Sequence, residues 1–262
     1  MSNCFKNSFR RKKSFTNFKL NLSGWGNDQA LELMFHCFQT RSSLQVLSLK
    51  LKDALEVDIK TISRLFQILQ NLQNLQTLKI KFDTIINRAP LDFVSDSSTG
   101  FPSLKHLSLS FTQCEGIKPI LLRTLGGYFK HLITLVSMSL LFATCDIDDE
   151  GLSELRNALA QFSSLEQLSL PFKFCSLITN NGLAAIGRNI EQMPALKSLF
   201  LRCKRCMEID EEGFNTLKNQ IINDTTLQPV KFMIVPANKT FTIHSSDLEE
   251  SYEFSDFSNQ DR

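Results

Sequence analysis

The sequence lacks any apolar run long enough to cross a membrane. No stretch approaches the ~18 consecutive apolar residues that a spanning helix needs, although 42% of the residues are hydrophobic. It also lacks a strong net charge, since 29 basic and 27 acidic residues leave a formal charge of +2. These absences predict a core-forming protein without a spanning helix, and the overall charge does not indicate a polyanionic ligand.

A secretory signal is also missing. Residues 1–14 form a basic arm without a long apolar core, and the first acidic residue is Asp28. Together with an odd number of cysteines, seven, this predicts an intracellular, reducing compartment. The cytoplasm is favoured, with the mitochondrion or nucleus as alternatives, because a basic, acid-free start also fits a mitochondrial presequence.

Motifs that carry catalytic chemistry are not found. The sequence contains no glycine-rich phosphate loop, no nucleophile elbow and no H-E-x-x-H helix. The histidines show no i, i+4 pairing and no acidic partner at ligand spacing; they are His36, His106, His131 and His244. We therefore expect a protein without enzymatic activity or cofactor.

What the chain does contain is one apolar pattern of eight residues, here called the octet, repeated along its length. Eight octets begin at residues 15, 44, 75, 104, 135, 165, 196 and 227, at intervals of 29 to 31 residues. The fourth, sixth and eighth residues of each octet are apolar, which is the alternation of a half-buried β-strand. This regularity predicts stacked units, each consisting of an octet and the residues up to the next one.

A helical pattern lies between the later octets. In the segments that begin at Ile147, Ile178 and Ile209, apolar residues recur three and four positions apart, and acidic or amide residues stand at the start. Strand and helix therefore alternate, which predicts an α/β fold. Glycines recur at one phase of the helical pattern, where they are expected to allow close approach between units: Gly151, Gly182 and Gly213.

The cysteines invite a metal or redox interpretation that the repeat argues against. Cys203 and Cys206 form a C-x-x-C, a spacing used by zinc and redox sites. However, the residue ten positions beyond the start of four consecutive octets is always a cysteine: Cys114, Cys145, Cys175 and Cys206. One cysteine per unit predicts a buried ladder along the stack rather than a metal site, with Cys203 filling the eighth position of its octet.

These residues resemble the leucine-rich-repeat family, specifically its ribonuclease-inhibitor type, over residues 15–234. The signature of that type is L-x-x-L-x-L-x-x-N/C-x-L-x-x-x-G-x-x-x-L-x-x-x-L, and the residues similar to it are Leu135, Met138, Leu140, Cys145, Ile147, Gly151, Leu155 and Leu159. The chain departs from it by about two extra residues between strand and cysteine. The resemblance implies a horseshoe-shaped solenoid of about eight repeats, with a parallel concave β-sheet and convex helices.

On the predicted concave face, the second, third, fifth and seventh residues of each octet are expected to point outward. Eight of them are basic and one, Glu166, is acidic, while Leu141, Pro171, Phe200 and Met233 add exposed apolar side chains. The predicted partner-binding residues are Lys19, Lys50, Lys79, Lys81, Lys105, Lys197, Phe200, Arg202 and Lys231. The alternative is that these lysines are ordinary solvated residues of an open sheet face.

The family resemblance implies a binding role without naming a partner, because its members inhibit enzymes, stimulate small GTPases, sense ligands or scaffold assemblies. We predict a non-enzymatic protein-interaction or scaffold protein, a peripheral subunit of a larger assembly, that binds an acidic partner through the concave face. The alternative is an RNA-contacting subunit of a ribonucleoprotein using the same basic face. Few aromatic residues are available there for base stacking, which favours the protein partner.

The C-terminal region is predicted to differ from the repeats. Residues 235–244 are expected to add a strand that caps the open edge of the sheet. Residues 245–262 form an acidic segment with interspersed aromatic residues, predicted to be a flexible tail. Two further hypotheses are that this tail folds back onto the basic face or docks on a partner.

Overall fold

A computed structural model gives the fold of the chain. It describes residues 16–23, 38, 43–54, 59–85, 101–114, 119–190, 193–222, 230–235 and 241–243. The predicted basic arm, residues 1–14, and the predicted acidic tail, residues 245–262, lie outside the described residues. For the last two strands only the backbone is described.

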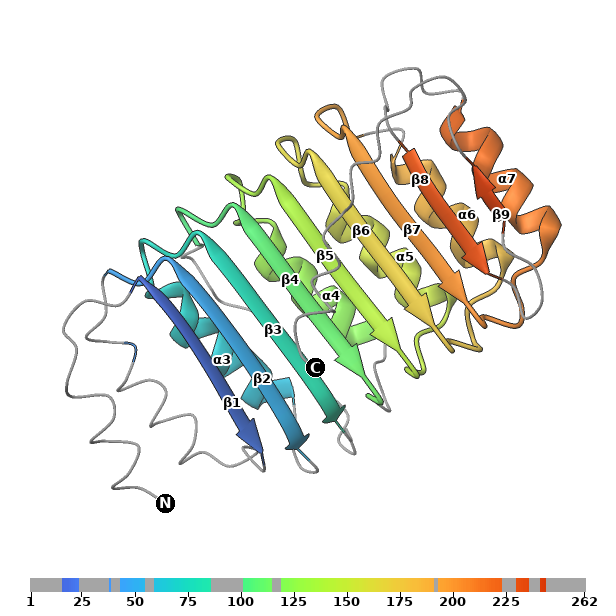
Figure 1. The fold of residues 1–262 in the computed structure, drawn as a ribbon. Coiled ribbons are helices and arrows are strands. Elements are labelled where there is room, and N and C mark those ends of the chain that lie inside the picture. Colours follow the sequence, from blue (N-terminus) through green and yellow to red (C-terminus); the bar gives the residue numbers. More distant parts are fainter. Residues whose placement is uncertain are drawn as a thin grey trace.

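The described strands form one sheet of nine, in which every strand lies beside its neighbours in the sequence (Figure 1). The strands from β1 to β8 pair in parallel, and β9 pairs antiparallel with β8. Their bounds are β1 Asn17–Ser23, β2 Val46–Ala54, β3 Thr77–Ile85, β4 His106–Thr112, β5 Ser137–Ala143, β6 Gln167–Lys173, β7 Ser198–Lys204, β8 Val230–Val235 and β9 Phe241–Ile243.

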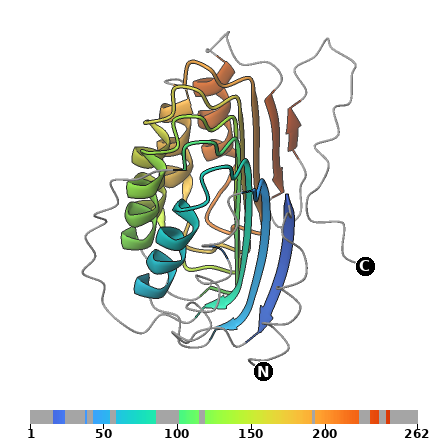
Figure 2. The same cartoon turned by 90° about the vertical axis from the view of Figure 1, so that its left-hand side faces the viewer.

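The helices that the structure describes lie on one side of this sheet, as the edge-on view shows (Figure 2). They are α3 Ile59–Gln70, α4 Pro119–Phe129, α5 Asp149–Leu159, α6 Asn180–Ile190 and α7 Glu211–Ile222. None of these helices is long and apolar enough to cross a membrane. The α/β class predicted from the sequence is confirmed, and the open parallel sheet fits a leucine-rich-repeat-like fold. The repeat number and the horseshoe shape stay predictions.

The octets stay in register across the sheet. The sixth residue of one octet lies opposite the sixth residue of the next, as in the pairs Leu20 with Leu49 and Ile80 with Leu109. A shift by one residue would turn the whole apolar set away from the helices, so the octet pattern specifies the register strongly. The predicted burial of the fourth, sixth and eighth residues is found in β4, β5 and β7, where alternate residues are buried.

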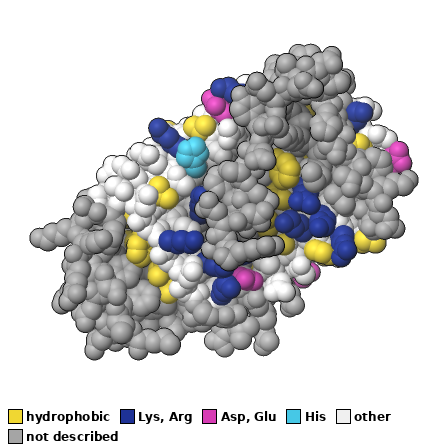
Figure 3. Space-filling view, in the orientation of Figure 1, with side chains coloured by type: hydrophobic (Ala, Val, Ile, Leu, Met, Phe, Trp, Pro, Cys, Tyr) yellow, Lys and Arg dark blue, Asp and Glu magenta, His cyan; other side chains and the backbone are white. Residues whose placement is uncertain are grey.

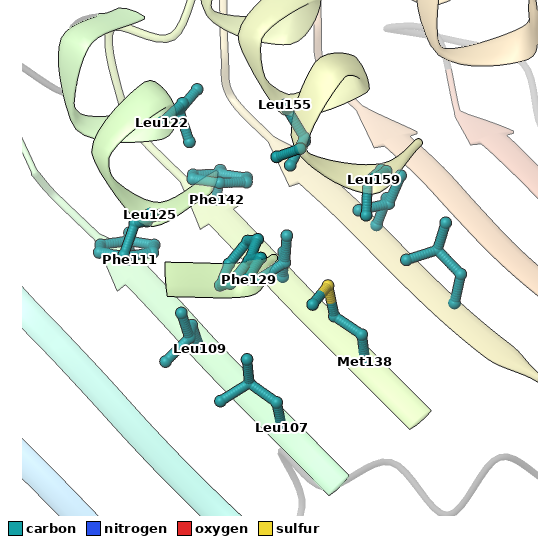
Figure 4. Packing of buried hydrophobic residues seen from close by; sticks show 14 of the residues in the cluster. Leu107, Leu109, Phe111, Leu122, Leu125, Phe129, Met138, Phe142, Leu155 and Leu159 are labelled. Atoms are coloured by element: carbon teal, nitrogen blue, oxygen red, sulfur yellow. The ribbon is translucent and has the colours of Figure 1, made fainter. Parts of the chain in front are cut away.

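The eighth residues of four successive octets form an aromatic stack through the middle of the core. Phe82, Phe111, Phe142 and Phe172 are buried, with successive ring centroids 5.1, 5.4 and 5.7 Å apart. The rings are nearly parallel, since consecutive planes differ by 11°, 7° and 7°. Leucines of the helices pack against the apolar side of the strands (Figure 4). Each ring is therefore shielded from solvent on both faces only because the neighbouring units are present.

A left-handed residue ends each strand from β4 to β7. Gln113, Thr144, Phe174 and Arg205 have φ between 51° and 56°. The backbone N–H groups of three of them continue the ladder, since Gln113, Thr144 and Phe174 donate to the carbonyls of Ala143, Lys173 and Lys204 at 2.9, 2.8 and 2.8 Å. This conformation is costly for a branched residue such as Thr144, so the hydrogen bonds offset strain at these three turns.

The left-handed turn directs the following cysteine into the core, where the predicted ladder is found. Cys114, Cys145, Cys175 and Cys206 are all buried. The Sγ of Cys145 lies 3.4 Å from the carbonyl oxygen of Phe111 in the preceding unit and 3.3 Å from that of Ala143 in its own unit. Cys175 makes the same pair of contacts with Phe142 and Lys173, at 3.7 and 3.5 Å. The thiols of Cys145 and Cys175 thus each join two successive units.

The helix starts are joined in a similar way. Asp148 caps α5 by accepting from the backbone N–H of Gly151 at 2.8 Å. The next residue, Asp149, bridges to the following unit, where it accepts from the backbone N–H of Thr179 at 2.9 Å and from its hydroxyl at 2.6 Å. A Cβ on Gly182 would collide with this same Asp149 carboxylate. The expectation that these glycines allow close approach between units is therefore met.

Replacing Gly182 with alanine is expected to destabilise the protein although alanine favours helices. The added Cβ would displace the Asp149 carboxylate and break its bonds to Thr179. We expect the free energy of unfolding in urea to fall by about 1–2 kcal/mol. The matched control is Asn181→Ala, an exposed neighbour in the same helix. A Gly182→Ala protein as stable as the native one would contradict this close approach.

Truncating one ring of the aromatic stack should be far more costly than truncating an exposed side chain. Phe142→Ala leaves a cavity between two stacked rings and is expected to cost about 3–5 kcal/mol of unfolding free energy, with Phe142→Leu as a milder variant. Ile133, whose side chain is 77% exposed, provides the control, and Ile133→Ala should stay within about 0.5 kcal/mol. Equal effects of Phe142→Ala and Ile133→Ala in chemical denaturation would rule out the stack as a source of stability.

Candidate functional site

The candidate site is the outward face, defined as the side of the sheet opposite the helices. It carries the third, fifth and seventh residues of each octet, which are exposed or half-buried in β4, β5 and β7. The strands continue one residue beyond the octet, so the ninth residue also lies on this face. Figure 3 views the molecule from this side.

The ninth position is the part of the site that the sequence analysis missed. It adds three basic residues, Lys52, Lys173 and Lys204, and the acidic residue Asp83. The octet as defined stops at its last apolar residue. The ninth residue varies too much between units to stand out as part of a repeat. Extending the period-two alternation by one residue would have found these side chains.

Five lysines form an N-terminal basic cluster on β1, β2 and β3: Lys19, Lys50, Lys52, Lys79 and Lys81. Lys50 lies directly opposite Lys81 in the register, and Lys79 is two strands away from Lys19 at the same height, with Ser48 between them. Partial burial lowers the pKa of Lys79, and the charge of Lys19 lowers it further. Asp83, which lies opposite Lys52, is the acidic residue described on this part of the face.

The pKa of His106 is affected by the positive charge beside this cluster. Its pKa lies below the usual histidine range, first because of partial burial and then because of the charges of Lys105 and Lys79. The imidazole at the start of β4 is thus kept neutral more readily than a free histidine. Lys105 is exposed just before the strand, at the edge of the outward face.

A second set of basic residues, the C-terminal basic cluster, lies on β6 and β7 and directly after β7: Lys173, Arg202, Lys204 and Arg205. Lys173 lies opposite Lys204 in the register. Arg202 is half-buried, and among the described residues its Nε has no hydrogen-bond partner. Basic side chains are visible at both places on the outward face, over β2 and β3 and near the ends of β6 and β7 (Figure 3).

The remaining predicted residues are placed less uniformly. Phe200 is half-buried on β7, and Lys231 lies opposite it on β8, where side chains are not described. Lys197 precedes β7, and its Nζ forms an ion pair with Glu166 Oε1 at 2.8 Å. The one acid predicted on the face therefore neutralises one of the predicted binding residues, so Lys197 adds little net charge to the site.

A neutral strip on β4, β5 and β6 separates the two clusters. Its members are Ser108, Ser110, Ser139, Leu141, Ser169 and Pro171. The prediction that Pro171 is exposed is wrong, because both Pro171 and Ser169 are buried. These small side chains lie opposite the larger Arg202 and Phe200, only one strand spacing away, so their neighbours shield them. Leu141 remains half-buried.

The cysteine ladder does not offer metal ligands in the part of the chain that the structure describes. No group of three or more His, Cys, Asp or Glu residues there is arranged to hold a metal ion. Hydrogen bonding to Cys206 raises the pKa of Cys175, and the same interaction together with full burial raises that of Cys203. Hydrogen bonds from neighbouring thiols lower the pKa of Cys145 and of Cys206 in turn, so the direction of the pKa shift alternates along the ladder.

Removing a single lysine should move the pKa of His106. Lys79→Gln and Lys105→Gln each remove a repelling charge, so the pKa of His106 is expected to rise toward its ordinary value in an NMR titration. Lys197→Gln, beside β7, is the control and should leave it unchanged. Because the folded state disfavours the charged imidazole, its protonation destabilises the fold as pH falls through the range between the ordinary pKa and the lowered one. A pKa insensitive to both lysines would remove the evidence for a shared potential.

Comparisons with known proteins do not place the chain in a family. No family model matches it, and no curated protein matches it. A comparison with solved structures matches 66 chains. One is described as leiomodin-1 actin-binding site 2, with 18% sequence identity and a TM-score of 0.36. The match covers 45% of the present chain and 64% of that chain, which is less than two thirds of its length. Similarity at this level does not assign a function to the present chain.

Proposed function

We propose that this chain is a non-catalytic binding protein that engages an acidic partner protein through the outward face of its sheet. The observation that carries the proposal is the pairing of two basic clusters with a neutral strip between them. Three strand steps separate β3 from β6, which corresponds to about 14 Å. An acidic protein surface can therefore contact both clusters at once.

The chemistry of this face suits protein recognition. Basic side chains at both ends would steer an acidic partner and fix its orientation. The strip between them presents serines together with half-buried Leu141, and Phe200 flanks it on β7, so the centre of the contact can exclude water. Charged surroundings with a less polar centre are the usual composition of a protein interface.

We further propose the finer features that the family resemblance implies. These are a horseshoe of about eight repeats of the ribonuclease-inhibitor type, and a scaffold role as a peripheral subunit of a larger assembly. A curved sheet would wrap the outward face around its partner and enlarge the contact. In this arrangement the helices form the outer surface and leave the sheet to bind.

An RNA partner uses the same charges but needs more aromatic surface. Proteins that hold single-stranded RNA combine basic grooves with several aromatic side chains on which bases stack. At the outward positions whose side chains are described on β4 to β7, Phe200 is the one aromatic ring apart from the imidazole of His106. The proposal therefore favours a protein partner.

Reversing two charges of the N-terminal basic cluster should weaken binding. The partner that copurifies with the tagged full-length chain is identified by mass spectrometry, purified and titrated against Lys79→Glu/Lys81→Glu. We expect the dissociation constant to rise at least ~tenfold, because attraction becomes repulsion. The matched control reverses Lys130 and Lys218, at the end of α4 and in α7, and should change it less than ~twofold.

The same preparation separates the two classes of partner. Nuclease treatment before purification should leave a protein partner attached. Loss of the partner after RNA digestion would support the ribonucleoprotein alternative and contradict the proposal. Unchanged binding by Lys79→Glu/Lys81→Glu would place the interface outside the N-terminal basic cluster.

A further inference from the structure

Exposed apolar side chains gather at one corner of the described structure. Phe174, Leu177 and Met207 are 46%, 50% and 63% exposed, and all three lie on the loops that follow β6 and β7. Ile133, also strongly exposed, lies apart from them in the turn after α4. We call Phe174, Leu177, Met207 and the adjoining Arg205 the apolar corner. Large apolar side chains clustered in water mark a binding surface more often than isolated ones do.

The left-handed backbone conformation is found at two residues of the apolar corner. Phe174 and Arg205 occupy the left-handed position of their turns, with φ of 55° and 56°. The guanidinium carbon of Arg205 lies 5.2 Å from the centroid of the Phe174 ring, which is a cation–π contact. The two preceding units carry Gln113 and Thr144 at the same position. The stacked aromatic and cationic pair is therefore a feature of these two units and does not follow from the repeat.

The corner continues directly into the C-terminal basic cluster. Lys173 immediately precedes Phe174, and Lys204 immediately precedes Arg205. Lys173 lies opposite Lys204 in the register and Arg205 contacts the Phe174 ring, so three basic residues stand beside the exposed Phe174 in the sequence or on the neighbouring strand. The combined surface would bind a segment that alternates acidic and apolar side chains.

We propose that the apolar corner binds the chain's own C-terminal segment, residues 247–257. This segment, which lies outside the described residues, has the sequence DLEESYEFSDF and alternates acidic residues with Tyr252, Phe254 and Phe257. It contains no basic residue. Its carboxylates match the lysines and Arg205, and its rings match the exposed Phe174, Leu177 and Met207.

The last described residue before this segment, Ile243, lies within reach of the corner. Strand β9 ends at Ile243 and pairs with β8, which in turn pairs with β7. The eleven residues from Ile243 to Phe254 can span about 36 Å when extended. The three strand steps from β9 to β6 correspond to about 14 Å across the sheet, and the four residues from Leu170, which is level with Ile243, to Phe174 add about 13 Å along the strand. The direct distance is then about 19 Å, which the extended segment can span. A tether of this length keeps the effective concentration of the segment in the millimolar range, so modest contacts are sufficient.

The N-terminal basic cluster is a poorer site for this segment. It includes the acidic residue Asp83, and none of the strongly exposed large apolar side chains in the described ranges lies on β1, β2 or β3. Carboxylates would find partners there, but the three aromatic rings would stay in water. The inference does not depend on the proposed function. It uses Lys173, Lys204 and Arg205 of the C-terminal basic cluster, where the segment would compete with the partner, whereas the titration above tests the N-terminal basic cluster.

Photo-crosslinking in the full-length chain tests the contact. The photoreactive amino acid p-benzoylphenylalanine replaces Phe254, the protein is irradiated at low concentration, and crosslinked peptides are identified by mass spectrometry. We expect the main crosslinks within one molecule, at residues 174–177 and 204–207. Met207 is a favourable acceptor for the reactive ketone because its thioether side chain is exposed and flexible.

Variants separate a specific contact from a chance encounter. Lys204→Glu/Arg205→Glu and, separately, Phe174→Asn should each lower the crosslink yield at the corner at least ~fivefold. Asparagine is chosen at position 174 because it tolerates the left-handed backbone. The controls are Ile133→Ser, for loss of an exposed apolar side chain, and Lys19→Glu/Lys50→Glu, for charge reversal elsewhere. Both should leave the yield within ~twofold, and circular dichroism checks that every variant is folded.

Four outcomes would overturn the inference. They are crosslinks mainly to β1–β3, crosslinks between two molecules whose yield rises with protein concentration, a yield that Lys204→Glu/Arg205→Glu does not change, and the absence of any crosslink. The readout requires no partner. A failure here therefore leaves the titration with the copurified protein unaffected, and a failure of that titration leaves this result unaffected.

Discussion

The structure depends on parallel strands that pair in strict register, so that each octet position stands beside the same position of the next unit. No unit can bury its apolar side alone, because one face of Phe82, of Phe111 and of Phe142 is covered by the ring of the following unit. The same register places thiols between successive units and lets Asp149 bond across to Thr179. Burial, hydrogen bonding and shape complementarity thus all act between neighbours along the stack.

Register also determines the electrostatics of the outward face. Like charges directly opposite each other on a sheet destabilise it, and Lys50 lies opposite Lys81 while Lys173 lies opposite Lys204. Partial burial lowers the pKa of Lys79 and of His106, and the positive charges of neighbouring lysines lower both further. Carboxylates supplied by another surface would relieve this repulsion. The repulsion and the proposed binding therefore both arise from the same basic residues.

Much of the fold could be predicted from the sequence because it follows from local repetition. The apolar alternation predicted the strands, the spacing after Ile147 predicted α5, and the constant phase of the cysteines predicted their ladder. The left-handed turns were not predictable, since Gln113, Thr144 and Phe174 carry no common side-chain signal and their conformation is held by backbone hydrogen bonds. The ion pair that neutralises Lys197 depends on a residue 31 positions away. The burial of Pro171 likewise depends on its neighbours across strands.

In each of the left-handed turns the residue type differs, although the backbone conformation is the same. Glutamine, threonine, phenylalanine and arginine occupy the same backbone conformation in four successive units. Since the cysteine that follows them secures the turn from below, the side chain above it can be exchanged without loosening the core. This edge of the molecule is therefore a row of exposed positions whose residues differ between units, at an energetic cost that is larger for branched side chains. It can acquire a new specificity through single substitutions while the architecture beneath is conserved.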